Sequence, residues 1–225
     1  MMMTDPRADV VGCYHVAGKA EFFPARYDEL ERQAVGMARV LQSFSFAPGS
    51  VILTVSSVGE VAQFAAFEKA IQITGHYGTN AEASMFDAGR VESICRQFAP
   101  VGVFGVTQAT LEGLKMFGHD PERVFGGRTV WARPDAHEGL SRVAGIDLRR
   151  IVVLGPAIAF DCGEGGLHFA SRDWALAAGD TLKLSSRMPR ITPLDGVDTG
   201  VEGRVSTMPC ACGSRDLTIT LGVKA

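Results

Sequence analysis

Apolar residues recur at helical spacing along residues 28–44 of the chain. The residues on this apolar face are Leu30, Ala34, Met37, Ala38 and Leu41. Pro48 and Gly49 end the pattern. We therefore predict an amphipathic helix over residues 28–44 that packs against a sheet.

From residue 50 to residue 155, short β-branched runs alternate with helical patterns. The predicted strands are 51–55, 76–79, 101–107, 128–132 and 150–154. The predicted helices are 57–74, opened by a capping box of Ser57 and Glu60, then 87–98, 108–117 and 136–144. This alternation is typical of βαβ units, so the fold class is α/β, with a mainly parallel sheet flanked by helices.

The composition of the chain changes after residue 155, where glycine, aspartate, serine and proline become frequent. Short alternating runs follow, namely GLHFA, TLKLSS and LTITLG. They predict a small β-rich part. We divide the chain into an α/β core of residues 1–155 and a β-rich, zinc-binding appendage of residues 156–225, packed on the core as one unit.

The composition is that of a globular protein, with 46% hydrophobic and 21% charged residues. The net charge of −3 comes without long runs of either sign, so we expect no nucleic-acid partner. No apolar stretch is long enough for a membrane span, and the first residues lack the basic and apolar regions of a signal peptide. We therefore expect a cytoplasmic chain with reduced thiols and no membrane partner.

Four residues of the β-rich part form a candidate metal site. They are Cys162, His168, Cys210 and Cys212. Three thiolates and an imidazole are a common ligand set for structural zinc. The spacing Cys-x-Cys is not a strong zinc-finger signature, so free buried thiols beside a surface histidine remain an alternative. Cys13 and Cys95 lack such neighbours and are interpreted as packing residues, and the other histidines receive no catalytic role.

The segments GPAIAFDCGEGGLHFASRDW, at 155–174, and PCACGSRDLTITLG, at 209–222, carry a family resemblance. Both resemble the phenylacetate-coenzyme A ligase branch of the AMP-forming, adenylate-forming enzymes. The shared features are Gly-Pro, Phe-Asp-Cys, Gly-Leu-His and Pro-Cys-x-Cys-Gly, in the same order and with similar spacing. The resemblance implies that the four Cys and His residues hold a structural zinc ion.

Three departures from the family pattern bear on ATP. The family's Ser, Thr and Gly-rich phosphate loop corresponds to residues 13–20, where only Gly18 and Lys19 match. These two are candidate nucleotide-binding residues, with a loop glycine and a solvated lysine as the alternative. The segment 147–154 lacks the tyrosine and glutamate that the family uses for adenine and magnesium. In the family's ribose-binding segment, Asp195 or Asp198 corresponds to the aspartate, but the family's arginines and tyrosine are missing. The alternative is that these aspartates form turns beside Gly196 and Gly200.

The sequence leaves three functional hypotheses. The first is a truncated relative of the ligase that lacks the ATP loop and the C-terminal domain with its catalytic lysine, keeps zinc, and binds an aryl or acyl ligand as an accessory protein. The second is an active acyl-CoA or aryl-CoA ligase, or an acyltransferase, completed by a partner chain. The third is a protein-interaction subunit, which binds other proteins on the face that forms the active site in the ligase family.

We also predict assembly into a homodimer or a hetero-complex. Six large apolar residues fall at the ends of predicted elements, where burial within one chain is difficult. They are Phe22, Phe23, Met85, Phe86, Met116 and Phe117.

Overall fold

A computed structural model describes residues 7–16 and 19–222 of the chain. Its contacts group the chain into two units. The first contains residues up to 44, residues 59–70 and residues from 153 onward, and the second contains residues 45–58 and 71–152. The predicted domain division at residue 155 stays a prediction.

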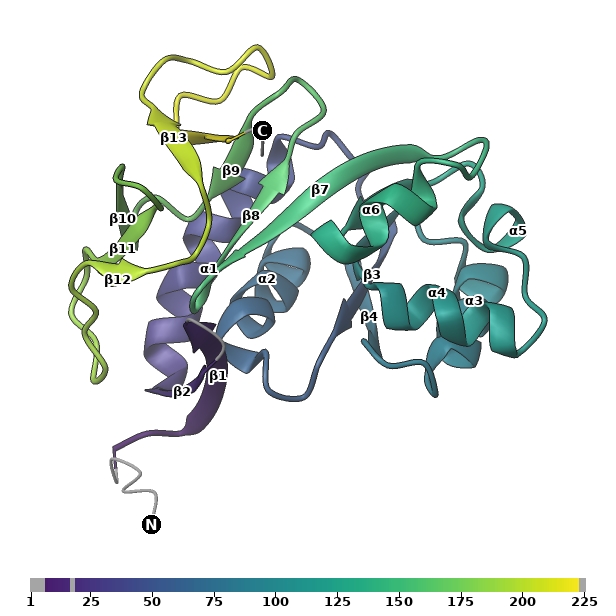
Figure 1. Cartoon of the computed structure of the whole chain (residues 1–225), viewed down its shortest axis with the longest axis horizontal. Helices are drawn as coiled ribbons and strands as arrows, with labels where there is room; N and C mark the ends of the chain where they lie inside the picture. The colour runs from purple at the N-terminus through teal and green to yellow at the C-terminus, as the bar shows by residue number, and fades with distance from the viewer. Residues whose placement is uncertain (1–6, 17–18, 223–225) are drawn as a thin grey trace. The chain divides into compact units, whose positions relative to one another are not determined.

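The second unit holds five parallel strands, of which Figure 1 labels β3, β4 and β7. They are β3 (Val51–Ser56), β4 (Tyr77–Glu82), β5 (Gly102–Val106), β6 (Thr129–Ala132) and β7 (Asp147–Leu154), the last of which runs on into the first unit. Their order is β4-β3-β5-β6-β7, and every neighbouring pair is parallel. The predicted α/β fold with a mainly parallel sheet is therefore confirmed.

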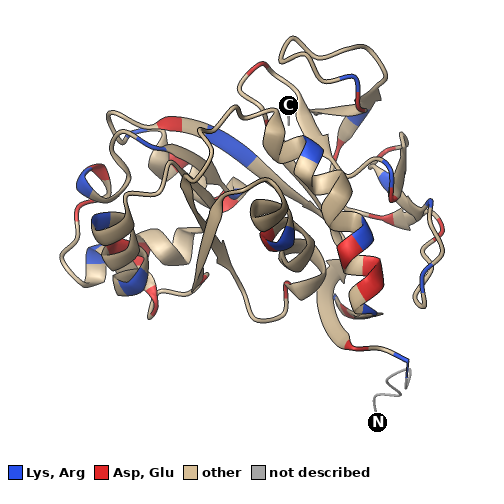
Figure 2. Ribbon diagram, turned by 180° about the vertical axis from the view of Figure 1, so that it is seen from behind, with Lys and Arg blue, Asp and Glu red and all other residues tan. Residues whose placement is uncertain are grey.

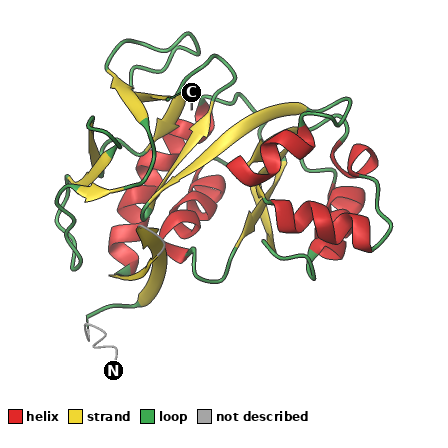
Figure 3. Ribbon diagram, in the orientation of Figure 1, coloured by secondary structure: helices red, strands yellow, loops and turns green. Residues whose placement is uncertain are grey.

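Four helices lie beside these strands (Figure 3). They are α3 (Ala88–Phe98), α4 (Gln108–Met116), α5 (Pro121–Phe125) and α6 (Pro134–Leu140). Apolar residues of all four helices share one buried cluster with strand residues such as Leu53, Val103 and Val130. The burial of this continuous apolar face is the main stabilising contribution.

The first unit contains the helix predicted over residues 28–44, which the structure places at α1 (Tyr27–Gln42). Acidic residues lie in its first turn, where the helix dipole favours negative charge, and Figure 2 shows them at the start of this helix. Most of α2 (Val61–Ile73) belongs here as well. Because α2 begins at Val61, the helix start predicted at Ser57 is wrong by about one turn, and residues 58–60 form a turn instead.

The remaining strands of the first unit are antiparallel where they pair. They are β1 (Val10–Val16), β2 (Lys19–Ala25), β8 (Ala157–Asp161), β9 (Leu167–Phe169), β10 (Trp174–Ala177), β11 (Lys183–Ser186), β12 (Val197–Asp198), β13 (Gly203–Ser206) and β14 (Thr218–Leu221). The strands expected in GLHFA, TLKLSS and LTITLG are present as β9, β11 and β14. The hairpin of β1 and β2 is absent from the sequence prediction.

None of the helices in the described part of the chain is both long enough and apolar enough to cross a bilayer.

A glycine contact between α3 and α4 offers a test of the packing in the second unit. A Cβ atom on Gly113 would lie 2.1 Å from the Met85 carbonyl oxygen and 2.6 Å from the Ala88 Cβ atom. We expect Gly113→Ala to lower the free energy of unfolding by about 1–3 kcal/mol, because backbone has to move to admit the methyl group. The measurement is urea unfolding followed by circular dichroism.

Gly89→Ala is the matched control, because a Cβ atom there has no heavy atom within 4 Å. That substitution should leave the free energy of unfolding unchanged or raise it by up to about 1 kcal/mol, since alanine favours helix. Equal stability of the two variants would contradict the packing.

Candidate metal centre

The ligand residues Cys162 and His168 are positioned by neighbouring strands. Cys162 directly follows β8, and His168 is the middle residue of β9. In the antiparallel register, His168 pairs with Phe160 on one side and with Thr218 of β14 on the other. The backbone N–H of Cys162 donates to the Gly166 carbonyl oxygen at 3.1 Å, which closes the turn between β8 and β9.

The loop between β13 and β14 carries the other two ligand residues, Cys210 and Cys212. The N–H of Cys210 donates to the Ser214 carbonyl oxygen at 2.9 Å, and the N–H of Gly213 donates to the Cys210 carbonyl oxygen at 2.9 Å. Gly213 has a φ of 90°, in the left-handed region that favours glycine. This tight turn directs both thiols to one side of the loop.

A second glycine, Gly166, permits the close approach of the loop to the β8–β9 turn. A Cβ atom at this position would lie 3.0 Å from the Cys210 sulfur. The absence of a side chain at Gly166 therefore makes room for the Cys210 thiol, a positional role that the spacing of cysteines does not reveal.

The four ligand atoms lie within 4.8 Å of one another. The Cys162 and Cys210 sulfurs are 3.6 Å apart, and the Cys212 sulfur is 3.3 Å from Nε2 of His168. A tetrahedral zinc ion with standard bond lengths separates such ligand atoms by about 3.5–3.8 Å. The cluster thus has the size and the donor chemistry of a metal site.

Burial and hydrogen bonds shift the pKa values of three of the four ligand residues. Burial raises the pKa of the Cys162 thiol to about 11, although backbone N–H groups of Glu164 and Gly166 act to lower it. For Cys210, burial also acts to raise the pKa, but hydrogen bonds from Cys212 and Cys162 outweigh it and the pKa is lowered. Burial lowers the pKa of His168, which favours the neutral imidazole that binds metal. A metal ion supplies the positive charge that a buried thiolate needs.

The predicted nucleotide-binding residues are not part of this cluster. Gly18 lies outside the described residues, and Lys19 is exposed at the start of β2. Asp198 in β12 accepts hydrogen bonds from Lys183 Nζ at 2.6 Å, from Thr181 Oγ1 at 2.5 Å and from the Gly200 N–H at 2.8 Å. The hydrogen bonds from Lys183 and Thr181 hold the pKa of Asp198 well below its usual range. The role of Asp198 in nucleotide binding stays a prediction. Asp195, the other candidate, is exposed.

Within residues 13–20, which the sequence analysis aligns with a phosphate loop by resemblance, the described residues 13–16 and 19–20 lie in paired strands. The register of β1 and β2 pairs Val16 with Lys19, so only Ala17 and Gly18 stand between the paired ends. The hairpin is anchored by Gln63, whose Nε2 donates to the carbonyl oxygens of Cys13 and Gly155, both at 3.0 Å.

A buried ionic network in the first unit was missed by the sequence analysis. Asp173 is fully buried, and its Oδ1 accepts a hydrogen bond from Arg32 Nε at 3.2 Å and lies 3.5 Å from Arg190 Nη2. The Arg190 guanidinium stacks on the Trp174 ring at 4.0 Å from its centroid and donates to Gln33 Oε1 at 3.1 Å. These contacts join α1 to the segment 187–194.

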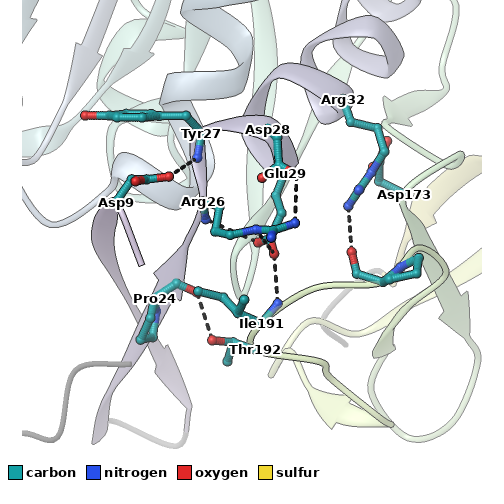
Figure 4. A network of polar contacts seen from close by, with 11 residues as sticks. Asp9, Pro24, Arg26, Tyr27, Asp28, Glu29, Arg32, Asp173, Ile191 and Thr192 are labelled. Carbon is teal, nitrogen blue, oxygen red and sulfur yellow. Dashed lines mark hydrogen bonds and ion pairs between the residues drawn. The ribbon is translucent and has the colours of Figure 1, made fainter. Parts of the chain in front are cut away.

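Figure 4 shows a second set of contacts, which join the segment 187–194 to α1 and to β2. Oε1 of the buried Glu29 accepts from the Ile191 N–H at 2.8 Å, and Thr192 Oγ1 donates to the Pro24 carbonyl oxygen at 2.8 Å. The signal in the sequence is the presence of Glu29 and Gln33 on the apolar face of α1, beside Leu30 and Ala34. Polar residues on a buried helix face require hydrogen-bond partners. Here the segment 187–194 supplies them, with Ile191 bonded to Glu29 and Arg190 bonded to Gln33.

Comparison with solved structures relates this fold to that of a ligase. The chain is similar to 2-hydroxyisobutyryl-CoA ligase in an open conformation with 2-HIB-AMP and CoA, with a TM-score of 0.72 and 11% identity over 97% of this chain and 57% of the ligase. In the postadenylation state with R3-HIB-AMP the TM-score is 0.71, with 11% identity over 96% of this chain and 50% of that one. The chain therefore spans about half the length of the ligase chains it matches.

No protein-family model matches the sequence, and the search of curated proteins found no match. At this sequence identity the structural likeness establishes the fold alone. The chain has the fold of the matched part of 2-hydroxyisobutyryl-CoA ligase.

Proposed function

We propose that this protein is a zinc-bearing relative of the AMP-forming acyl-CoA ligases, of the phenylacetate-coenzyme A ligase branch. In this proposal it binds an aryl or acyl ligand and does not activate that ligand with ATP on its own. The observation that carries the proposal is the register of β1 and β2, which leaves two residues between the paired strands.

A phosphate-binding loop needs successive backbone N–H groups that point at one anion. In a paired antiparallel hairpin, the backbone N–H groups along each strand alternate between donating to the partner strand and pointing away from it. Successive N–H groups therefore do not point at one anion. Between the paired ends Val16 and Lys19, the chain offers only Ala17 and Gly18, neither of which has a hydroxyl group. This arrangement supports the loss of the ATP phosphate site.

The zinc part of the proposal rests on the donor set and its dimensions. Cys162, His168, Cys210 and Cys212 supply four protein ligands, which leaves no open position for substrate or water. Such a closed site has a structural role. It would hold the loop between β13 and β14 against the turn between β8 and β9.

We expect no saturable binding of magnesium-ATP at millimolar nucleotide, measured by isothermal titration calorimetry on the full chain. The physical reason is the missing anion cradle, which in the family supplies much of the binding energy for the phosphates. As a control for folded protein, the same preparation should take up one zinc ion after treatment with a chelator. A micromolar dissociation constant for ATP would contradict the proposal.

The fold likeness to a ligase in complex with 2-HIB-AMP favours one second candidate, an active enzyme completed by a separate chain. Exchange of labelled pyrophosphate into ATP, with aryl and fatty acids as substrates, separates the two. Exchange by the chain alone would refute the first candidate, whereas exchange only with a co-purified partner chain would support the second.

The predicted homodimer or accessory-subunit role stays part of this proposal. Phe22, Phe86, Met116 and Phe117 are 47–78% exposed, which supports an interface. Phe23 is 1% exposed, so this residue belongs to the core.

A further inference from the structure

The thiols of the metal cluster differ in their access to solvent. Cys162 is 6% exposed, whereas Cys210 and Cys212 are only partly buried in the loop between β13 and β14. A small oxidant therefore reaches the loop thiols first. Oxidation of cysteine follows thiolate character and exposure, and metal-bound thiolates are deprotonated.

The Cys210 thiol has two thiol neighbours, Cys162 and Cys212. The Cys210 sulfur is 3.6 Å from the Cys162 sulfur, a residue 48 positions away in the chain. Cys212 is adjacent in the same Cys-x-Cys turn, and its sulfur also lies 3.3 Å from the imidazole Nε2 of His168. Gly166 helps to keep Cys210 beside Cys162, because any side chain there would contact the Cys210 sulfur.

We propose that Cys210 and Cys162 form a peroxide-sensitive thiol pair, which converts to a disulfide and releases the metal ion. Cys210 is the residue attacked by the oxidant, and Cys162 is the resolving residue. The inference rests on the zinc site of the proposed function and adds a modification site and an oxidant class, hydroperoxides.

The chemistry balances with hydrogen peroxide as the only oxidant. The Cys210 thiolate attacks one peroxide oxygen, the O–O bond breaks, an S–O bond forms, and the displaced hydroxide takes a proton from solvent to give water. The Cys162 thiolate then attacks the sulfur of the Cys210 sulfenic acid. An S–S bond forms, and hydroxide leaves and is protonated to the second water.

Metal release follows from the loss of ligands. After oxidation, only His168 and Cys212 remain as donors, which is half of the set. A dithiol reductant restores both thiols, so zinc binding returns when zinc is supplied again.

The test treats the zinc-loaded full chain with hydrogen peroxide and follows three readouts. We expect release of one zinc per chain to a colorimetric chelator, loss of two of the five thiols, and a peptide that links Cys162 to Cys210. The intact mass of the denatured, metal-free polypeptide should fall by about 2 Da, the mass of two hydrogen atoms. Dithiothreitol followed by zinc should reverse every change.

Three variants make the assignment specific. Cys212→Ser retains the reacting pair and should still form the Cys162–Cys210 link, whereas Cys210→Ser should not. Cys13→Ser replaces a partly buried thiol outside the cluster and should behave like the wild type. A sulfinic or sulfonic acid on Cys210 without any link, or a link between Cys210 and Cys212 instead, would overturn the proposal.

The redox proposal and the metal site of the proposed function can fail independently of each other. Absence of zinc in the reduced protein would refute the metal site, but the reaction of the metal-free thiols can still be followed by mass. Zinc that stays bound while Cys13 is oxidised would overturn the redox proposal and leave the metal site intact.

Discussion

Replacing Cys212 with serine is expected to remove zinc from the purified protein and to lower its melting temperature by roughly 10 °C. A ligand that binds only the folded state stabilises it by about 4 kcal/mol when its free concentration is 1,000 times the dissociation constant. In a chain of this size, each kcal/mol shifts the melting temperature by about 2–4 °C. Cys212 is the appropriate site because it is partly exposed, so the serine itself adds little desolvation cost.

Metal analysis by mass spectrometry and differential scanning calorimetry provide the measurements. The protein should be purified without an affinity tag that binds metal. Cys13→Ser, which changes a comparable thiol outside the cluster, should keep one zinc per chain and its melting temperature. A chelator added to the wild type should reproduce the loss seen in Cys212→Ser. Zinc content well below one per chain in the wild type would refute the metal site.

The second large effect is expected at the buried ionic network. Asp173→Ala should lower the free energy of unfolding by about 3–5 kcal/mol, because breaking a buried ion pair leaves uncompensated charge. The Asp173 and Arg190 side chains are both fully buried, and Arg32 is 22% exposed. Both guanidinium groups would lose their shared carboxylate. Urea unfolding of the variant and the wild type measures the difference.

Two further variants sharpen the interpretation of Asp173→Ala. Asp173→Asn keeps the size of the side chain and removes its charge, so most of the loss should remain. Glu138→Ala breaks the pair with Arg142, whose side chains are 82% and 74% exposed, and should change stability by less than about 1 kcal/mol. Zinc content should stay at one per chain in all three. If Asp173→Asn matched the wild type in stability, packing rather than charge would explain the effect of alanine.

The sequence was sufficient to predict the α/β class and most elements of the second unit. Helix α1 and strands β3, β5 and β6 were predicted within a few residues, because their apolar periodicity reports which side of an element is buried. The helix start before Val61 was wrong because a capping-box pattern also occurs in turns. The hairpin of β1 and β2 was missed because its residues were assigned to a loop by resemblance.

For the candidate site, the sequence by itself determined the donor chemistry, since thiols and an imidazole are properties of single residues. Only the tertiary structure decided that Cys210 lies beside Cys162. The same holds for the contacts of Arg190 with Asp173 and with Gln33, which is 157 positions from Arg190 in the chain. The physical reason is that local patterning encodes how deeply a residue is buried and not which distant residue it meets. Such pairs are selected when whole elements pack, because closing a long loop costs little more than closing a shorter one.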